Sequence, residues 1–157
     1  MARMDDALRD ALADHPALER VDGSYRVTTL AVAATITVEG ETIVVEVVLP
    51  ALGVSVRDAV VPEVVEEEWS ETLPRRLEDG YDVARSPPAA PVDVERTPTA
   101  VTVRYAIEPT DARGGVADAK ALAEFTQGTY VQGAIPGYEY DPPLAELLAG
   151  AWDADAS

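Results

Sequence analysis

Apolar and polar side chains alternate along the middle of the chain in the manner of β-strands. Residues 25–29 alternate between apolar and polar side chains, and residues 34–38 alternate cleanly, which is typical of a strand with one face exposed to water. Residues 42–49 form a nearly continuous apolar run that ends at Pro50, as expected for a central strand covered on both faces. Because a turn residue, Gly40, separates the last two runs, we predict a β-hairpin there.

A second hairpin is predicted further along the chain. Residues 92–95 and 100–107 alternate, and a turn at residues 97–99, Thr-Pro-Thr, connects them. Residues 84–91 contain three prolines and are expected to form a stiff loop. The pattern of residues 51–60 is ambiguous, and a short strand over residues 54–57 is one interpretation of it.

The start of the chain and residues 62–79 place apolar side chains at the spacing of amphipathic helices. The first helix is expected to end at His15, because the residue before a proline avoids helical backbone. In the second helix Pro62 suits the first position, Pro74 is expected to kink or split the helix, and Gly80 is expected to cap its end. The predicted buried positions are Met4, Leu8, Ala11, Leu12, Val65, Trp69, Leu73 and Leu77.

Two more helices are predicted in the last third of the chain. One runs over about 116–127, after a loop over 109–115, and the other over about 143–151. The acidic tail, residues 153–157, is expected to be frayed. The predicted inward positions of these helices are Ala117, Ala121, Leu122, Phe125, Leu144, Leu147 and Leu148.

The predicted elements follow the order α-β-β-β-α-β-β-α-α within one domain over residues 1–152. Consecutive antiparallel strands with separate helices favour an α+β fold, with a sheet of about five strands and helices mainly on one face. This order resembles the fold of type III secretion chaperones and their YbjN-like relatives, although the last helix departs from it. The resemblance rests on element order alone and assigns no functional residue.

The charge of the chain is strongly unbalanced. Asp and Glu total 29 against 12 Lys and Arg, for a net charge of −17, and Lys120 is the only lysine. Such an excess repels itself in dilute buffer, whereas at about 1 M salt the Debye length falls to about 3 Å. This composition, together with the stretch ALAEFTQGTYVQG at 121–133, resembles families restricted to halophilic archaea that have no assigned activity. We therefore interpret the acids as an adaptation to salt.

The composition also bounds location and partners. No apolar run is long enough to span a bilayer, and the first residues carry acids instead of a hydrophobic signal core, so we expect a cytoplasmic protein without membrane contact. The arginines are scattered, with only Arg75 and Arg76 adjacent, and no basic stripe for phosphate contacts forms. We therefore expect no nucleic-acid partner.

Motifs for catalysis, metals and cofactors are missing from the sequence. There is no cysteine, and His15, the only histidine, is interpreted as a helix-end residue instead of a general base. The acids at 66–68 point in different directions on a helix, and Gly114-Gly115 lack the remainder of a phosphate-binding loop. We predict no catalytic residue, no metal site and no cofactor.

The best candidate for a binding site is the Gly-, Pro- and Tyr-rich segment 128–142, which we predict as a loop. Tyrosine offers a large, stiff contact surface with a polar tip, and loops on a rigid scaffold often carry function. The alternative, which we favour, is that these tyrosines cap the edge of the sheet core, where phenylalanine is scarce. The candidate binding residues are Tyr130, Gln132, Tyr138, Glu139 and Tyr140.

Three functions follow as hypotheses. The first is a non-catalytic interaction protein, an adaptor or chaperone-like module that binds another protein or forms a homodimer. The second is an enzyme or small-molecule binder that uses carboxylates and tyrosines of the segment 128–142, which requires a deep pocket with at least two acids. The third, nucleic-acid binding, requires a clustered arginine face.

Overall fold

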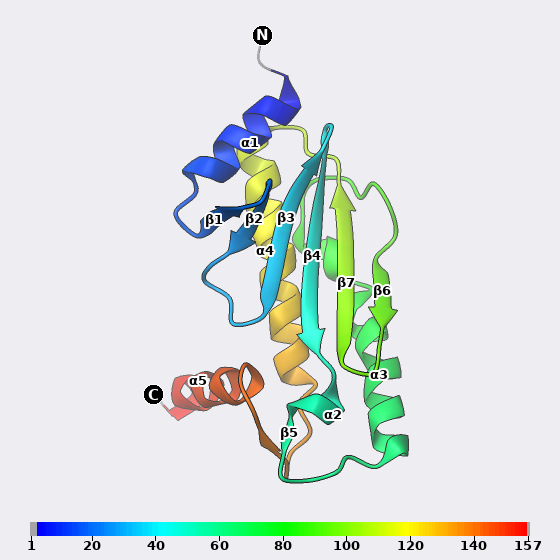
Figure 1. Ribbon diagram of the computed structural model, residues 1–157. Helices are drawn as coiled ribbons and strands as arrows, with labels where there is room; N and C mark the ends of the chain where they lie inside the picture. Colours follow the sequence, from blue (N-terminus) through cyan, green and yellow to red (C-terminus); the bar gives the residue numbers. More distant parts are fainter. Residues whose placement is uncertain (1–2, 157) are drawn as a thin grey trace.

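Six antiparallel strands form the main sheet of the computed structural model, in the order β1-β2-β3-β4-β7-β6 (Figure 1). The structure describes residues 3–156, with side chains described for residues 3–150. The strands are β1 Leu18–Val21, β2 Ser24–Val27, β3 Ala33–Glu39, β4 Thr42–Pro50, β6 Asp93–Arg96 and β7 Ala100–Ile107. The fold is therefore α+β with an antiparallel sheet, as the pattern predicts, and the sheet has six strands instead of about five.

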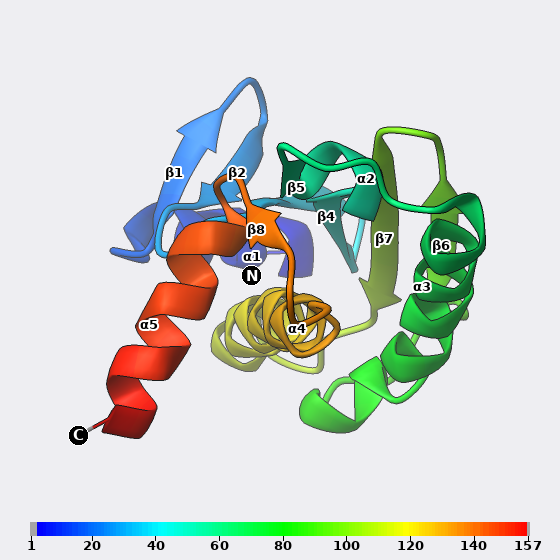
Figure 2. The same ribbon diagram turned by 90° about the horizontal axis from the view of Figure 1, so that it is seen from below.

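The helices gather mainly on one face of this sheet. α4 packs against β4 and β7, α1 packs against β1 and β3, and the two helices contact each other. Figure 2 shows α4 nearly end-on, on one side of the sheet. A second, two-stranded sheet pairs β5, Val56–Arg57, with β8, Glu139–Tyr140. The helical elements are α1 Met4–Asp14, α2 Leu52–Ser55, α3 Glu63–Leu77, the 3-10 helix η1 Gly80–Val83, α4 Ala112–Gln132 and α5 Leu144–Ala156.

Both predicted hairpins are confirmed. β3 and β4 pair from Ala33 opposite Val48 to Glu39 opposite Thr42, with Gly40 at a φ of 63° in the turn between them. β6 and β7 are joined through residues 97–99, where the Thr97 amide donates to the Ala100 carbonyl oxygen over 2.8 Å. The ambiguous stretch 54–57 resolves into the end of α2 followed by the short strand β5.

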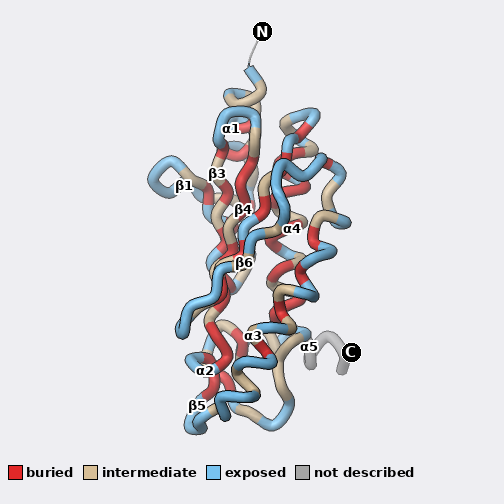
Figure 3. Tube along the Cα trace, turned by 90° about the vertical axis from the view of Figure 1, so that its right-hand side faces the viewer, coloured by how far each residue is buried: buried red, intermediate tan, exposed pale blue. Residues whose placement is uncertain are grey.

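The central strand β4 is completely buried on one face and only partly covered on the other, which corrects the expectation that both faces are covered. Ile43, Val45, Val47 and Leu49 face the helices and are completely buried. On the other face Glu46 and Val48 are half-buried, and Val44 is 8% exposed. Buried and more accessible positions therefore alternate along β4 from Val45 onward, as the colours of the strand indicate (Figure 3). Valine is favoured at such positions because its branched side chain packs against cross-strand neighbours without a covering layer.

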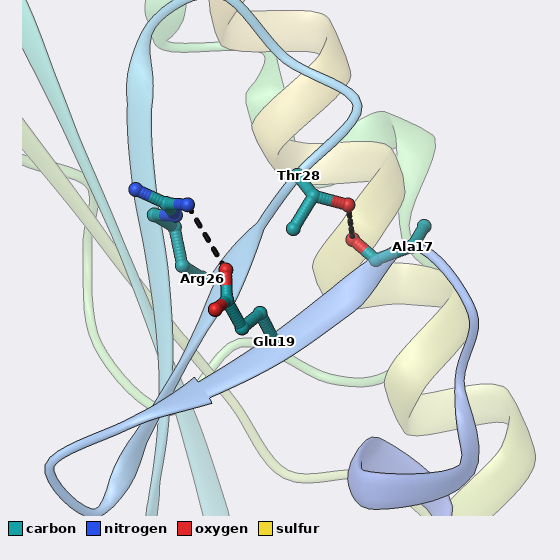
Figure 4. A network of polar contacts seen from close by, with 4 residues as sticks. All are labelled: Ala17, Glu19, Arg26 and Thr28. Carbon is teal, nitrogen blue, oxygen red and sulfur yellow. Dashed lines mark hydrogen bonds and ion pairs between the residues drawn. The ribbon is translucent and has the colours of Figure 1, made fainter.

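The edge strand β1 was missed by the pattern because little of it is buried. Leu18 is half-buried, and the other three residues are exposed. Its pairing with β2 is nevertheless regular, and Thr28 extends the ladder by donating its amide and its hydroxyl to the Ala17 carbonyl oxygen (Figure 4). Glu19 and Arg26 face each other in the same hairpin, with Arg26 Nη2 donating to Glu19 Oε2 over 3.0 Å.

α3 forms without a break at Pro74, so the predicted split does not occur. A proline in a helix leaves the carbonyl four residues earlier without its amide donor. That carbonyl belongs to Ser70, and Arg96 Nη1 donates to it from β6 over 3.2 Å. The predicted stripe is otherwise confirmed, with Trp69, Leu73 and Leu77 buried and Val65 half-buried.

The expected cap at Gly80 is wrong, since α3 ends at Leu77 with Glu78 as its C-cap, and Gly80 opens η1 instead. The glycine is required there by packing. A Cβ at this position would lie 2.7 Å from Cε1 of Tyr105, whose ring is completely buried. Gly80 therefore marks a close approach between two elements and not a helix cap.

α4 is longer than predicted at both ends and includes parts of the two predicted loops, 109–115 and 128–142. Asp111 caps its start, with Oδ1 accepting from the Gly114 amide over 2.7 Å. Gly115 lies inside this helix, and a larger residue would not fit there, because a Cβ would be 2.7 Å from Cβ of Pro109. The longer helix also corrects the predicted inward face, because Ala117 is exposed.

The end of α1 and the start of α5 agree with the predicted pattern. α1 ends at Asp14 with His15 as its C-cap, as predicted, and buries Leu8 and Leu12. α5 begins at Leu144, which is buried, and extends to Ala156. The predicted frayed tail, residues 153–157, falls where side chains are not described, and Ser157 lies outside the described residues, so fraying stays a prediction.

Candidate functional site

One face of α3 borders a groove against the end of α4. The groove has a volume of about 340 Å³ and is lined by six residues of α3 and two of the segment after α4. The six helix positions follow the spacing i, i+3, i+4, i+7, i+8, i+11, so they form one continuous stripe on the helix. The lining residues are Val65, Glu68, Trp69, Thr72, Leu73, Arg76, Gly133 and Ile135. We refer to this feature as the α3–α4 groove.

Trp69 forms the floor of the α3–α4 groove. Its ring packs edge-on against Tyr130 of α4, with ring centroids 6.2 Å apart and planes at 73°. Tyr130 is almost completely buried, and its hydroxyl donates to the Pro50 carbonyl oxygen over 3.0 Å. The floor of the groove is thereby fixed through Tyr130 to the end of β4.

The indole N–H of Trp69 is open to the groove. No described residue accepts a hydrogen bond from Trp69 Nε1, although no buried polar side-chain atom among the described residues lacks a partner. The nitrogen is therefore accessible, even though the residue as a whole is only 7% exposed. An indole N–H in such a position usually binds an acceptor, so the groove offers apolar surface together with one hydrogen-bond donor.

The wall opposite α3 is held in place by a local clamp. Tyr140 Oη accepts from the Ile135 amide and donates to the Ile135 carbonyl oxygen, each over 2.8 Å. This pair of bonds fixes the turn after α4, so that Ile135 lies against the groove while remaining half-buried. Tyr138 packs on the Tyr140 ring, with centroids 6.4 Å apart.

Two charged residues of opposite sign lie at the rim. Glu68 and Arg76 are both exposed and lie about two helical turns apart on α3. Arg76 Nη1 donates to the Gln132 carbonyl oxygen over 3.5 Å, a long bond that joins α3 to the end of α4. Glu68 is the only acid among the lining residues, so the groove does not bring together the two carboxylates that the small-molecule hypothesis requires.

The predicted site residues occupy supporting positions. Tyr130 and Tyr140 are buried and hold the floor and the wall of the groove, as the core-edge alternative predicts for tyrosines of this segment. Tyr138 is half-buried behind the wall. Gln132 is exposed at the end of α4, and Glu139 is exposed in β8. The structure thus brings the tyrosines of the segment together, but they do not line a pocket of their own.

The ionisation of these tyrosines follows from their surroundings. Burial raises the pKa of Tyr130, and a hydrogen bond with Ser55 offsets part of that effect. Burial also raises the pKa of Tyr140, against the opposing effect of its bond to the Ile135 backbone. Both hydroxyls are therefore neutral under ordinary conditions and act here as hydrogen-bonding groups that hold the backbone.

Sequence reasoning identified Trp69 as a buried stripe residue and missed its part in a groove. Thr72 and Arg76 continue the same stripe along α3 with polar side chains. This polar extension was the sequence signal that could have indicated a groove. An apolar stripe that widens into Thr and Arg at i+3 and i+7 predicts a helix face that is only partly covered. Ile135 had no comparable signal, because its position depends on the Tyr140 clamp.

Other chemistry finds no support in the described part of the chain. Residues 3–150 contain no group of three or more His, Asp or Glu side chains arranged to hold a metal ion. None of the described helices is long and apolar enough to cross a membrane. His15 Nδ1 accepts from the Ala17 amide over 3.1 Å, so its ring is engaged in ending α1.

Comparisons with known proteins bear on fold and family. No curated protein sequence matches the chain. Among solved structures, the fold is similar to the crystal structure of YbjN from E. coli, with a TM-score of 0.45 and 13% identity over 81% of this chain and 91% of that chain. Similarity at this level carries no information about function. A family model described as "Family of unknown function (DUF5813)" matches residues 13–150, and the chain therefore belongs to the DUF5813 family.

Proposed function

We propose that this chain is a non-catalytic protein-interaction module, an adaptor or chaperone-like protein, that binds an apolar segment of a partner protein in the α3–α4 groove. The observation that carries the proposal is the stripe on α3, which presents Trp69 and Leu73 at the floor of a groove with few polar groups. Tryptophan in a partly covered hollow is typical of the residues that dominate protein interfaces.

The shape of the groove favours a peptide segment over a small molecule. A volume of about 340 Å³ is near the lower end of small-molecule pockets, which span roughly 300–1,000 Å³. The hollow extends along α3 from Val65 to Arg76 and has charges of opposite sign at its rim. An amphipathic helix laid along the groove would place apolar side chains against Trp69 and Leu73 and polar ones at the rim.

Site-specific photo-crosslinking tests this proposal. A benzophenone amino acid at Thr72, a lining residue, should crosslink a defined protein in native cells, whereas the same group at an exposed position outside the groove should not. The substitution Ile135→Glu should abolish the crosslink, because it places a charge in the wall. Val83→Glu, an equal change at an exposed valine of η1, is the control and should leave the crosslink unchanged.

Two outcomes would contradict the proposal that a partner protein binds in the α3–α4 groove. A crosslink that survives Ile135→Glu in a folded variant would locate the partner elsewhere. If Thr72 gave no protein adduct and instead a small molecule protected Trp69 from quenching, the small-molecule hypothesis would be preferred.

The composition supports a high-salt cytoplasm as the place where this module works. A net charge of −17 with one lysine makes self-repulsion large in dilute buffer and small when the Debye length is about 3 Å. We expect the free energy of unfolding to rise steeply with KCl up to molar concentrations. Equal stability in near-pure water, measured by denaturant titration, would contradict this assignment.

A further inference from the structure

The face of the main sheet that points away from α4 carries a row of mostly charged residues that crosses all six strands. The pairing registers place Glu19 opposite Arg26, Arg26 opposite Thr35, Thr35 opposite Glu46, Glu46 opposite Arg104, and Arg104 opposite Asp93. Two ion pairs lie in this row, Arg26 with Glu19 over 3.0 Å and Arg104 with Glu46 over 2.9 Å. Figure 1 looks onto this open face, with α4 behind the strands.

The centre of the open face, on β3, β4 and β7, is electrically neutral in a chain of net charge −17. The two charged side chains there, Glu46 and Arg104, neutralise each other. The surplus acids of this face lie on its margins, with Glu39 at the end of β3 and with Asp93 and Glu95 on the edge strand β6. The remaining central residues are uncharged, namely Ala33, Thr35, Thr37, Val44, Val48, Thr102 and Ala106.

We infer that this open face is the surface on which two copies of the chain associate. Burying unpaired carboxylates between two molecules is costly even in molar salt, because added ions do not screen charges inside a closed contact, and this cost is smallest where the meeting surfaces carry no net charge. The α3 surface is the opposite case, because five glutamates lie along it. They are Glu63, Glu66, Glu67, Glu68 and Glu71. The charge distribution therefore selects the open face for a second copy over the helical side.

The central ion pair is self-complementary under two-fold symmetry. A two-fold axis parallel to the strands, lying between the two sheets and midway between β4 and β7, places Glu46 of one copy over Arg104 of the other, and the reverse. Each carboxylate then has an arginine beside it in its own chain and a second one across the interface. The small residues on either side allow two sheets to approach to about 10 Å.

The size of the face sets the strength of the association. The six strands contain 36 residues, which at about 3.4 Å per residue and about 4.8 Å between strands cover roughly 600 Å² in projection. Stable interfaces bury about 800 Å² on each partner. We therefore expect a reversible dimer that depends on protein concentration and is weakened by an unfavourable charge at its centre.

Sedimentation velocity over a concentration series in about 2 M KCl tests the inference. The native chain should change from monomer to dimer. Arg104→Glu should raise the dissociation constant at least about tenfold, because the introduced carboxylate would face Glu46 across the axis. The double variant Glu46→Arg with Arg104→Glu restores both the internal pair and the pairing between copies, so it should associate like the native chain.

Arg57→Glu is the matched control, since Arg57 is an exposed arginine in an ion pair of 2.8 Å outside this face, and it should leave association unchanged. A native chain that stays monomeric up to about 1 mM would overturn the inference. A dimer that persists in folded Arg104→Glu would also overturn it. If Arg104→Glu fails to fold, the double variant decides, because a folded double variant that stays monomeric contradicts the proposed axis.

Discussion

α4 and α3 lie beside the same sheet, yet they are packed in opposite ways. α4 buries nine of its 21 residues, including the polar Asp118, Thr126 and Thr129. α3 buries three of its 15 residues, all along one stripe. The sheet and α4 therefore form the scaffold, whereas α3 is held by a few contacts and leaves one of its faces to the groove. The two helices show how one core supports both a rigid element and a partly uncovered one.

The polar groups inside the α4 layer reinforce this difference. Asp118 accepts from the amides of Arg85 and Ser86 over 3.0 and 2.8 Å, and from the Ser86 hydroxyl, so it holds the loop that follows η1. Thr126 lies 2.8 Å from Tyr105 Oη and donates its hydroxyl to the Leu122 carbonyl oxygen. Buried polar groups of this kind are satisfied internally and leave nothing for a ligand.

Truncation of one leucine in each helix gives the largest expected effect and measures the difference directly. Leu122→Ala removes a completely buried side chain beneath the sheet and should lower the free energy of unfolding by about 2–5 kcal/mol. Leu73→Ala should cost less, about 1–3 kcal/mol, because its cavity merges with the groove and fills with water. Equal losses in urea titrations would mean that α3 is as firmly packed as α4.

The contact between Gly80 and Tyr105 gives the next effect. Gly80→Ala should destabilise the fold by about 1–3 kcal/mol, because the new methyl group meets the ring of Tyr105 at 2.7 Å. Gly128→Ala is the matched control within α4, where a Cβ meets nothing within 4 Å, and it should stabilise the chain by about 0.5–1 kcal/mol. Thermal unfolding of the two variants should therefore shift in opposite directions.

Asp118 links the packing of α4 to pH. Burial alone would raise the pKa of Asp118, but the hydrogen bonds from Ser86 and the Arg85 amide, with the charge of Arg85, lower it overall. A lowered folded pKa stabilises the fold above the unfolded value, near 3.9, and this contribution is lost as the pH falls through the folded pKa. Asp118→Asn should cost about 1–2 kcal/mol at neutral pH in urea titrations, with the deficit shrinking below about pH 4.

The smallest effect is expected for the Tyr105 hydroxyl. Tyr105→Phe removes its bond with Thr126 and should cost about 1 kcal/mol at neutral pH. Burial raises the pKa of Tyr105 to about 12, so the protonated hydroxyl stabilises the fold fully below about pH 10 and progressively less between about pH 10 and 12. The phenylalanine variant should therefore lose less stability than the native chain over that alkaline range in denaturant titrations, and an equal loss would contradict the assignment.

Local sequence patterns correctly predicted the elements whose structure depends mainly on nearby residues. The β3–β4 hairpin, α1 and the stripe of α3 follow from alternation, helical spacing and a glycine in a turn. The failures occur where distant residues decide. Arg96 satisfies the carbonyl that Pro74 leaves free, and the buried ring of Tyr105 is the reason for Gly80. Neither partner is visible from the neighbouring sequence.

The candidate site shows the same limit. Tyrosine enrichment in residues 128–142 pointed to the end of the molecule where the α3–α4 groove lies, but two of its tyrosines lie behind the groove. The surface itself belongs to α3, where Trp69 is far from Tyr130 along the chain and yet packs on its ring. Only the tertiary fold places the two segments together.

The paired charges on the open sheet face have a consequence for how this acidic molecule responds to its solvent. Added electrolyte relieves repulsion along α3, where glutamates crowd together, and it weakens attraction in the ladder from Glu19 to Asp93. Ionic strength therefore acts with opposite signs on the two sides of one small domain, and the salt dependence of its stability is the sum of the two effects.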